Sequence, residues 1–281
     1  MRPLLTQPGV RAGSIPVLAI ACGVMVGNIY LCQPLLAQMA QQFGIAEKSA
    51  SLVAVATQVG YALGLLLIVP LADMARPVLL VRSLMTITAI GLSAAALSPN
   101  IPILLVASIC FATVTVIPQI LMPLAPTLVA PENRGRSLGA LSTGLVLGIL
   151  LSRTVSGAVA GFSGTWRTPF ALAAVLTTIL LFVVPRFLPE APYGKTPTRY
   201  RDLLASLPSL LRHRSLLLSM GMNFCVFAGF SAFWATLAFQ LETPAFALGP
   251  AAVGLFGLWG TPGAPTAPIA GRLSDRWDPR R

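Results

Sequence analysis

Charge is scarce in this 281-residue chain, and histidine is almost absent. Charged residues make up 10% of the sequence, whereas a soluble globular domain carries about 25%. A soluble fold with so few charges could not cover its surface with polar groups, which excludes a water-soluble enzyme. Intrinsic disorder is excluded as well, because 56% of the residues are hydrophobic and the mean hydropathy is +0.81. Composition therefore indicates a membrane protein with several spans.

The sequence also lacks the residue clusters that hold metals or support nucleophilic catalysis. Its four cysteines lie inside apolar runs without a CxxC motif, and the single histidine, His213, stands between two arginines. This pattern predicts no metal, no cofactor and no disulfide framework. Residues 161–164 fit the GxSG pattern of rhomboid-type proteases. However, His213 is expected on the opposite side of the membrane from Ser163, so we expect no enzyme activity.

Eight apolar runs are long enough to cross a bilayer, which takes about 20 residues in a helix. None of them alternates polar and apolar positions as a barrel strand would. The predicted fold class is therefore all-α, a polytopic membrane protein. The predicted spans are 14–37, 50–72, 77–97, 101–127, 136–160, 167–188, 214–240 and 250–271.

The basic residues predict the orientation of these spans. All but three of the 19 lysines and arginines lie on the same side as the N-terminus, and the exceptions are Lys48, Arg153 and Arg167. Because lysine and arginine gather on the cytoplasmic side, we expect a cytoplasmic N-terminus. The net charge of +11 therefore reflects the basic residues of the predicted cytoplasmic side. No nucleic-acid partner is expected, because no basic patch is interleaved with surface aromatics.

The longest gap between spans is rich in proline and divides the chain into three predicted regions. Residues 1–188 form a six-helix transmembrane half, 189–213 a cytoplasmic linker, and 214–281 the first two helices of an incomplete second half. Leucines between Tyr200 and Leu211 recur at helical spacing, which predicts an amphipathic helix in the linker. The pattern leaves open whether this helix lies on the inner leaflet or packs on protein.

An internal repeat links the two halves, as in many transporter folds. Residues 70–76 at the end of the second span resemble residues 271–276 at the end of the eighth, and Asp73 and Asp275 in these segments lie 202 residues apart. The same offset relates Gly27 of the first span to Gly229 of the seventh. The chain therefore looks like six spans followed by the first two of a second six.

Several segments make the chain resemble the major facilitator superfamily, in its bacterial drug-efflux-like branch. They are Asn28-Ile29-Tyr30 with Gln33-Pro34, Pro118-Gln119 with Pro123, Arg134-Gly135-Arg136, and Gly271-x-Leu273-x-Asp275-Arg276. The resemblance implies a bundle of about eight transmembrane helices out of an expected twelve, and hence a C-terminally truncated chain. Two residues, Val69 and Met74, depart from the family's loop signature.

The resemblance also implies a function in the bacterial inner membrane. An intact relative would move an unidentified small molecule by alternating access, and we expect efflux by a secondary carrier. The expected partners are the lipid bilayer and this small molecule, and the protein is expected to be a monomer. A non-transporting truncated remnant is the alternative. The resemblance further implies an inner latch of charged and loop residues, namely Asp73, Arg76, Arg134, Arg136, Gly271, Asp275 and Arg276.

Polar side chains at membrane depth predict where a substrate would bind. Arg153 lies in the outer half of the fifth span, where it could bind an anionic group, pair with a carboxylate or snorkel to the headgroups. The seventh span presents an aromatic face that could line a cavity or contact lipid. The substrate-binding candidates are Asn28, Gln119, Arg153, Asn223, Phe227 and Trp234. No acidic residue lies at mid-membrane, so the sequence predicts no proton site.

Small residues recur at about every fourth position of the fifth span, which permits close helix contact. The predicted packing residues are Gly144, Gly148, Gly157 and Gly161.

Overall fold

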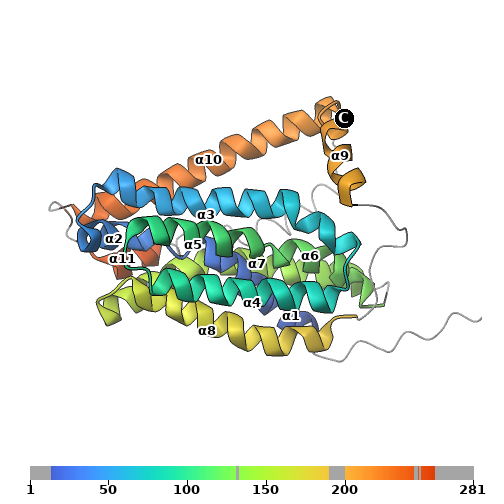
Figure 1. The fold of residues 1–281 in the computed structure, drawn as a ribbon, viewed down its shortest axis with the longest axis horizontal. Helices are drawn as coiled ribbons and strands as arrows, with labels where there is room; N and C mark the ends of the chain where they lie inside the picture. Colours follow the sequence, from blue (N-terminus) through green and yellow to red (C-terminus); the bar gives the residue numbers. More distant parts are fainter. Residues whose placement is uncertain (1–13, 131–132, 190–199, 244–245, 247, 257–281) are drawn as a thin grey trace, which may run out of the picture.

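The computed structural model describes residues 14–130, 133–189, 200–243, 246 and 248–256, and every regular element in these ranges is helical. The longer helices are α1 (Ser14–Tyr30), α3 (Glu47–Leu67), α4 (Pro77–Ala96), α5 (Ile101–Val114), α7 (Arg134–Ser163), α8 (Arg167–Val183), α9 (Tyr200–Leu210) and α10 (Arg214–Glu242) (Figure 1). The shorter ones are η1 (Gln33–Leu35), α2 (Leu36–Phe43), η2 (Val69–Asp73), α6 (Ile117–Leu124), η3 (Ala125–Thr127), η5 (Val184–Phe187) and α11 (Pro250–Leu255).

Within the described residues, seven helical segments are long and apolar enough to cross a membrane. They confirm the all-α membrane fold class. The first extends to Phe43 rather than residue 37, because the chain resumes a helical path as α2 after the break at Pro34. Of the eighth predicted span, 250–271, only its first part, α11, lies within the described residues. The seven segments are Ser14–Phe43, Glu47–Asp73, Pro77–Ala96, Ile101–Thr127, Arg134–Ser163, Arg167–Phe187 and Arg214–Leu241.

Proline, asparagine and glycine set several helix boundaries. Pro77 occupies the first turn of α4, where its missing N–H costs no helical hydrogen bond. Asn100 caps α5, because its side-chain oxygen accepts the backbone N–H of Ile103 at 3.1 Å. Pro118 follows the break between α5 and α6. Gly164 ends α7 with φ of +69°, a conformation that favours glycine.

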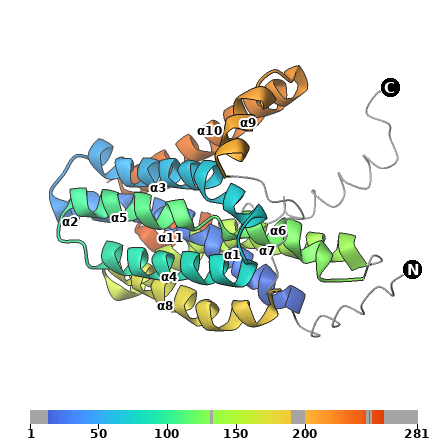
Figure 2. The same cartoon turned by 45° about the vertical axis from the view of Figure 1, so that its right-hand side comes forward.

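The first six spans form one bundle, and α1 lies in its interior (Figures 1 and 2). Among the seven spans, the one that begins with α1 is the most buried, and α1 contacts α7, α6 and α8. Helix α3 packs on α5, and α4 packs on both α5 and α8. One apolar cluster at each end of the bundle joins these helices.

Helices α1 and α7 approach closely because both carry glycine at their contact. A Cβ atom added at Gly23 would lie 2.7 Å from the carbonyl oxygen of Gly144, and Gly148 lies directly against the backbone of Gly23. At the other end of α7, a Cβ atom on Gly161 would lie 3.0 Å from the Cβ of Ala251 in α11. Gly157 is buried on the same helix. Helix α7 thus meets both α1 and α11 along its small residues.

Helix α10 packs on the bundle at one end only. Trp234 and Leu241 are buried at that end, where α10 contacts α2, η1 and α11. Toward Arg214, α10 diverges from the bundle and leads back to α9 (Figures 1 and 2). The large side chains of this diverging part are exposed, namely Leu216, Leu217, Leu218, Met220, Met222, Phe224, Val226 and Phe227.

The amphipathic helix predicted in the linker is present as α9. Its first residue, Tyr200, donates a hydrogen bond from its hydroxyl to the carbonyl oxygen of Leu67 at 2.8 Å. Tyr200 and the leucines at 203, 204 and 207 are half-buried, and the other residues of α9 are exposed. Helix α9 therefore begins against the end of α3 and makes its contact with protein there.

Candidate functional site

Arg153 is fully buried where α7 meets α10. Its Nε donates a hydrogen bond of 2.7 Å to Oε1 of Gln33, and its Nη1 donates one of 2.6 Å to the carbonyl oxygen of Ile149. The exposed fraction of Arg153 is 0%, so the guanidinium does not snorkel toward lipid headgroups. That alternative reading of the sequence was wrong, because η1 and α10 together cover the side chain.

Three aromatic rings surround this guanidinium. The Cζ atom of Arg153 lies 4.7 Å from the ring centre of Tyr30, 4.9 Å from that of Phe230 and 4.5 Å from that of Trp234. Cation–π contacts of this kind are worth about 2 kcal/mol or more when they are shielded from water. We refer to Tyr30, Gln33, Arg153, Phe230 and Trp234 as the Arg153 cluster.

Helix geometry explains why these residues meet. Phe230 and Trp234 lie four residues apart and therefore share one face of α10. Arg153 stands roughly 28 Å along α7 from Arg134, and Trp234 roughly 30 Å along α10 from Arg214, at the helical rise per residue. The chain turns from α1 into η1 immediately before Gln33. This turn brings the side chain of Gln33 within hydrogen-bond distance of Arg153.

No described carboxylate balances the charge of Arg153. The acidic side chains that the structure describes are Glu47, Asp73 and Asp202, and none of them contacts the guanidinium. In addition, Nη2 of Arg153 is buried without a hydrogen-bond partner in the described part of the chain. A guanidinium carries five N–H donors, and burying an unpaired one is unfavourable. Nη2 of Arg153 can therefore donate a hydrogen bond to one more acceptor, and an anionic acceptor would bind most strongly.

Two other predicted substrate residues lie beside the Arg153 cluster. The ring of Phe227 is centred 6.3 Å from that of Phe230, and it is 52% exposed on the diverging part of α10. Gln119 donates from Nε2 to the hydroxyl of Tyr61 at 3.1 Å, and Tyr61 packs in one apolar cluster with Tyr30 and Phe230. A strip of aromatic and amide groups therefore extends from Arg153 along the side of the bundle that faces α10.

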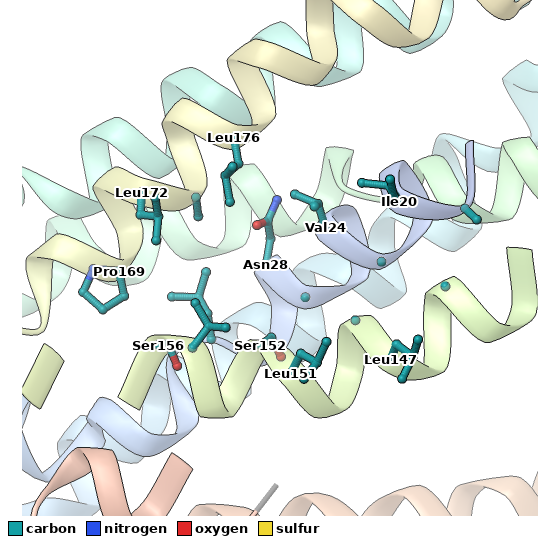
Figure 3. Close-up of a pocket in the computed structure, with 18 of the residues that line it drawn as sticks. Ile20, Val24, Asn28, Leu147, Leu151, Ser152, Ser156, Pro169, Leu172 and Leu176 are labelled. Atoms are coloured by element: carbon teal, nitrogen blue, oxygen red, sulfur yellow. The ribbon is translucent and has the colours of Figure 1, made fainter. Parts of the chain in front are cut away.

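Asn28 and Asn223 lie elsewhere. Asn28 donates from Nδ2 to Oγ1 of Thr177 in α8 at 3.4 Å. It lines a hollow of about 470 Å³ between α1, α7 and α8, where Figure 3 shows its side chain directed toward α8. Asn223 is exposed and donates to the carbonyl oxygen of Ser219 in its own helix. The six predicted residues therefore do not form one site.

The hollow beside Asn28 is almost entirely apolar, and Leu147 and Leu151 of α7 form part of its wall (Figure 3). At about 100° per residue, these leucines point away from Arg153 on the helix. Both are exposed, as expected for side chains that face the lipid. The Arg153 cluster, with its charge and free donor, is the stronger candidate for a substrate site.

The four predicted latch residues that the structure describes, Asp73, Arg76, Arg134 and Arg136, are exposed. Asp73 lies at the end of η2, and it forms no ion pair with Arg76, Arg134 or Arg136, all of which are described. The remaining latch residues, Gly271, Asp275 and Arg276, lie outside the described part.

The sequence identified Arg153 and Trp234 as substrate-binding candidates but not Tyr30. Gln33 stood out as a polar residue within the first span, and Phe230 as part of the aromatic face of the seventh, but neither was among the final candidates. The motif Gln33-Pro34 was a usable signal, because a proline that follows a polar residue inside an apolar run marks a helix break. Such a break frees a polar side chain to reach a neighbouring helix. Phe230 was recognisable only by its position on the same face of α10 as Trp234.

Comparisons with known proteins agree with this architecture. A family model described as Major Facilitator Superfamily matches residues 18–281. The chain is 38% identical over 263 residues to "Uncharacterized transporter YgaY" of Escherichia coli O157:H7, covering 93% of this chain and 66% of that protein. It is 34% identical over 269 residues to "Probable transporter SCO4007" of Streptomyces coelicolor, covering 94% of this chain and 61% of that protein. The chain thus spans less than two thirds of the length of these relatives.

A solved structure shares the fold. It is a bacterial homologue of the human lysosomal transporter Spinster, in an inward-facing and unoccupied conformation. The TM-score is 0.72 at 19% sequence identity, and the match covers 98% of this chain and 64% of that one.

Proposed function

Because this chain belongs to the Major Facilitator Superfamily, we propose that it moves a small molecule across the membrane by alternating access. Residues 14–188 would act as one half of the carrier and α10 with α11 as part of the other. The substrate would pass between them, and residues 189–213 would serve as a cytoplasmic linker.

One observation carries this proposal: a buried arginine with an unpaired donor lies between the six-helix bundle and α10. Intramembrane charges are unfavourable, and they usually mark a substrate or ion pathway. Arg153, Phe227 and Trp234 would contact the substrate, and Gln119 would act through Tyr61.

The end at which α10 diverges from the bundle would admit a substrate from the cytoplasm, as efflux requires. With the N-terminus in the cytoplasm of a bacterial inner membrane, the diverging end of α10 at Arg214 faces inward. Substrate would enter from the cytoplasm along the exposed face of α10, which carries Asn223, and reach Arg153 at the closed end.

The charges at the open end would form the latch in the opposite state. The connection between α3 and α4, which carries Asp73 and Arg76, lies at the same end of the bundle as the start of α7, which carries Arg134 and Arg136 (Figure 1). We expect them to pair with residues of the second half when that end closes. In this proposal Asp73→Asn slows transport without changing substrate affinity.

A flux measurement tests the proposal. The full 281-residue chain is reconstituted in liposomes loaded with a panel of small molecules, and the loss of each solute is followed by mass spectrometry. We expect at least one solute to leave faster than from protein-free liposomes, and Arg153→Gln to abolish the difference. If the flux of every solute is independent of the protein, the transport proposal is contradicted.

A further inference from the structure

We propose that the Arg153 cluster binds a monocarboxylate with a flat apolar body, and that this carboxylate docks on Nη2 of Arg153. This inference rests on the proposed function, because it names the substrate class of the same site. It follows from the charge, the free donor and the surrounding rings, taken in turn below.

The first argument is the charge. The guanidinium is fully buried, and the contacts that it makes are with an amide oxygen, a backbone carbonyl oxygen and three ring faces. Each of these partners is formally neutral, so none of them cancels the charge. A ligand with one negative charge would do so, since a carboxylate accepts charge-assisted hydrogen bonds from arginine.

The second argument is which donor of the buried guanidinium is left without a partner. Gln33 occupies Nε and Ile149 occupies Nη1, whereas Nη2 is unpartnered in the described part of the chain. An incoming oxygen would therefore bind at the Nη2 tip rather than displace the existing partners. Gln33 and Ile149 also hold the guanidinium plane in place, which reduces the conformational entropy lost on binding.

The third argument concerns valence. Arg153 is the single cation that contacts these rings among the described residues. A dianion such as sulfate or hydrogenphosphate would bring a second negative charge into a low-dielectric site without a matching cation. The cluster therefore favours a carboxylate over either dianion.

The fourth argument concerns the body of the ligand. Phe230 lies edge-on to both Phe227 and Trp234, with ring centres 6.3 Å apart in each pair. Phe227 is exposed on the diverging part of α10, so the aromatic surface continues from the buried charge toward the open end. A planar apolar group attached to the carboxylate can stack along this surface.

Equilibrium binding to the full chain in nanodiscs tests the inference with three probes of one shape. They are tritiated 1-naphthoate, its neutral amide 1-naphthamide, and the cation 1-naphthylmethylamine. We expect saturable binding of naphthoate, at least tenfold weaker displacement by the amide, and none by the amine. Sulfate and inorganic phosphate should displace naphthoate at least tenfold more weakly than unlabelled naphthoate does.

Three variants separate binding from folding. Arg153→Gln should weaken naphthoate binding at least tenfold. Gln33→Glu keeps the arginine and supplies an internal carboxylate, so it should also weaken binding while the protein still unfolds at or above the wild-type temperature. Arg167→Gln is the matched control, because Arg167 also lies over a tryptophan ring, at 4.5 Å, but its Nη1 already donates to two carbonyl oxygens. Its binding should stay at the wild-type level.

The outcomes distinguish this inference from the proposed function. Equal displacement by naphthoate and naphthamide, or wild-type affinity in Gln33→Glu, would overturn the monocarboxylate site. If liposomes show protein-dependent flux of a solute that naphthoate does not inhibit, the transport proposal is supported and the monocarboxylate site is contradicted. If naphthoate binds through Arg153 but no solute crosses the liposome membrane, the monocarboxylate site is supported and the transport proposal is contradicted.

Discussion

At the scale of single residues, the decisive feature is that the charge of Arg153 is held by neutral groups. Gln33 is the acceptor for Nε, so removing its oxygen leaves a buried cation with one partner fewer. We expect Gln33→Leu to lower the free energy of unfolding by about 1–3 kcal/mol, the range for leaving a buried donor unpaired. Thermal unfolding in detergent measures this loss. Gln33→Asn, which keeps the amide on a shorter side chain, should lose less.

Arg167 shows a contrasting arrangement, in which an arginine donates hydrogen bonds to backbone carbonyl oxygens at a helix end. Its Nη1 donates to the carbonyl oxygens of Ala96 at 2.9 Å and Ser98 at 2.7 Å, at the end of α4. A cation there also interacts favourably with the helix dipole. We expect Arg167→Met to destabilise the protein by about 1–3 kcal/mol. Arg82→Met, at an exposed position of α4, is the control. An equal loss of unfolding free energy in Arg82→Met would show that the hydrogen bonds of Arg167 to the end of α4 do not stabilise the fold.

At the scale of helices, the contact between α1 and α7 depends on the absence of side chains. Gly148 lies against the backbone of Gly23, so a methyl group at this position forces the two helices apart. We expect Gly148→Ala to destabilise the bundle by about 1–3 kcal/mol, as overpacking does. Gly139→Ala is the matched control on the same helix, because nothing lies within 4 Å of its added Cβ. Unfolding of both variants in detergent should show a loss for Gly148→Ala alone.

At the scale of the whole molecule, the orientation makes a prediction about accessibility. Ser206 in α9 and Ser163 at the end of α7 are both exposed, and the predicted topology puts them on opposite sides of the membrane. In a background with Cys110→Ser and Cys225→Ser, a membrane-impermeant maleimide added to intact cells should label Ser163→Cys. It should reach Ser206→Cys only after the membrane is permeabilised. The reverse pattern would invert the topology and, with it, the proposed direction of transport.

The sequence alone determined that this protein is embedded in lipid and in which order its spans follow one another. A chain with 10% charged residues and long apolar runs can cover its surface only with lipid, and each run must then form a helix to pair its own backbone groups. For this reason the seven spans that the structure describes follow the hydropathy of the sequence closely. The sequence also singled out Arg153, because a charge inside an apolar run is conspicuous.

Only the tertiary structure decided what surrounds that charge. Periodicity placed Phe230 and Trp234 on one face of α10, but it could not say which helix that face would meet. Gln33 reaches Arg153 because the chain turns into η1 after α1, and Asn28 faces α8 because of how α1 is rotated in the bundle. Helix rotation and the contact of α10 with the bundle arise from packing among distant segments, which local sequence does not encode.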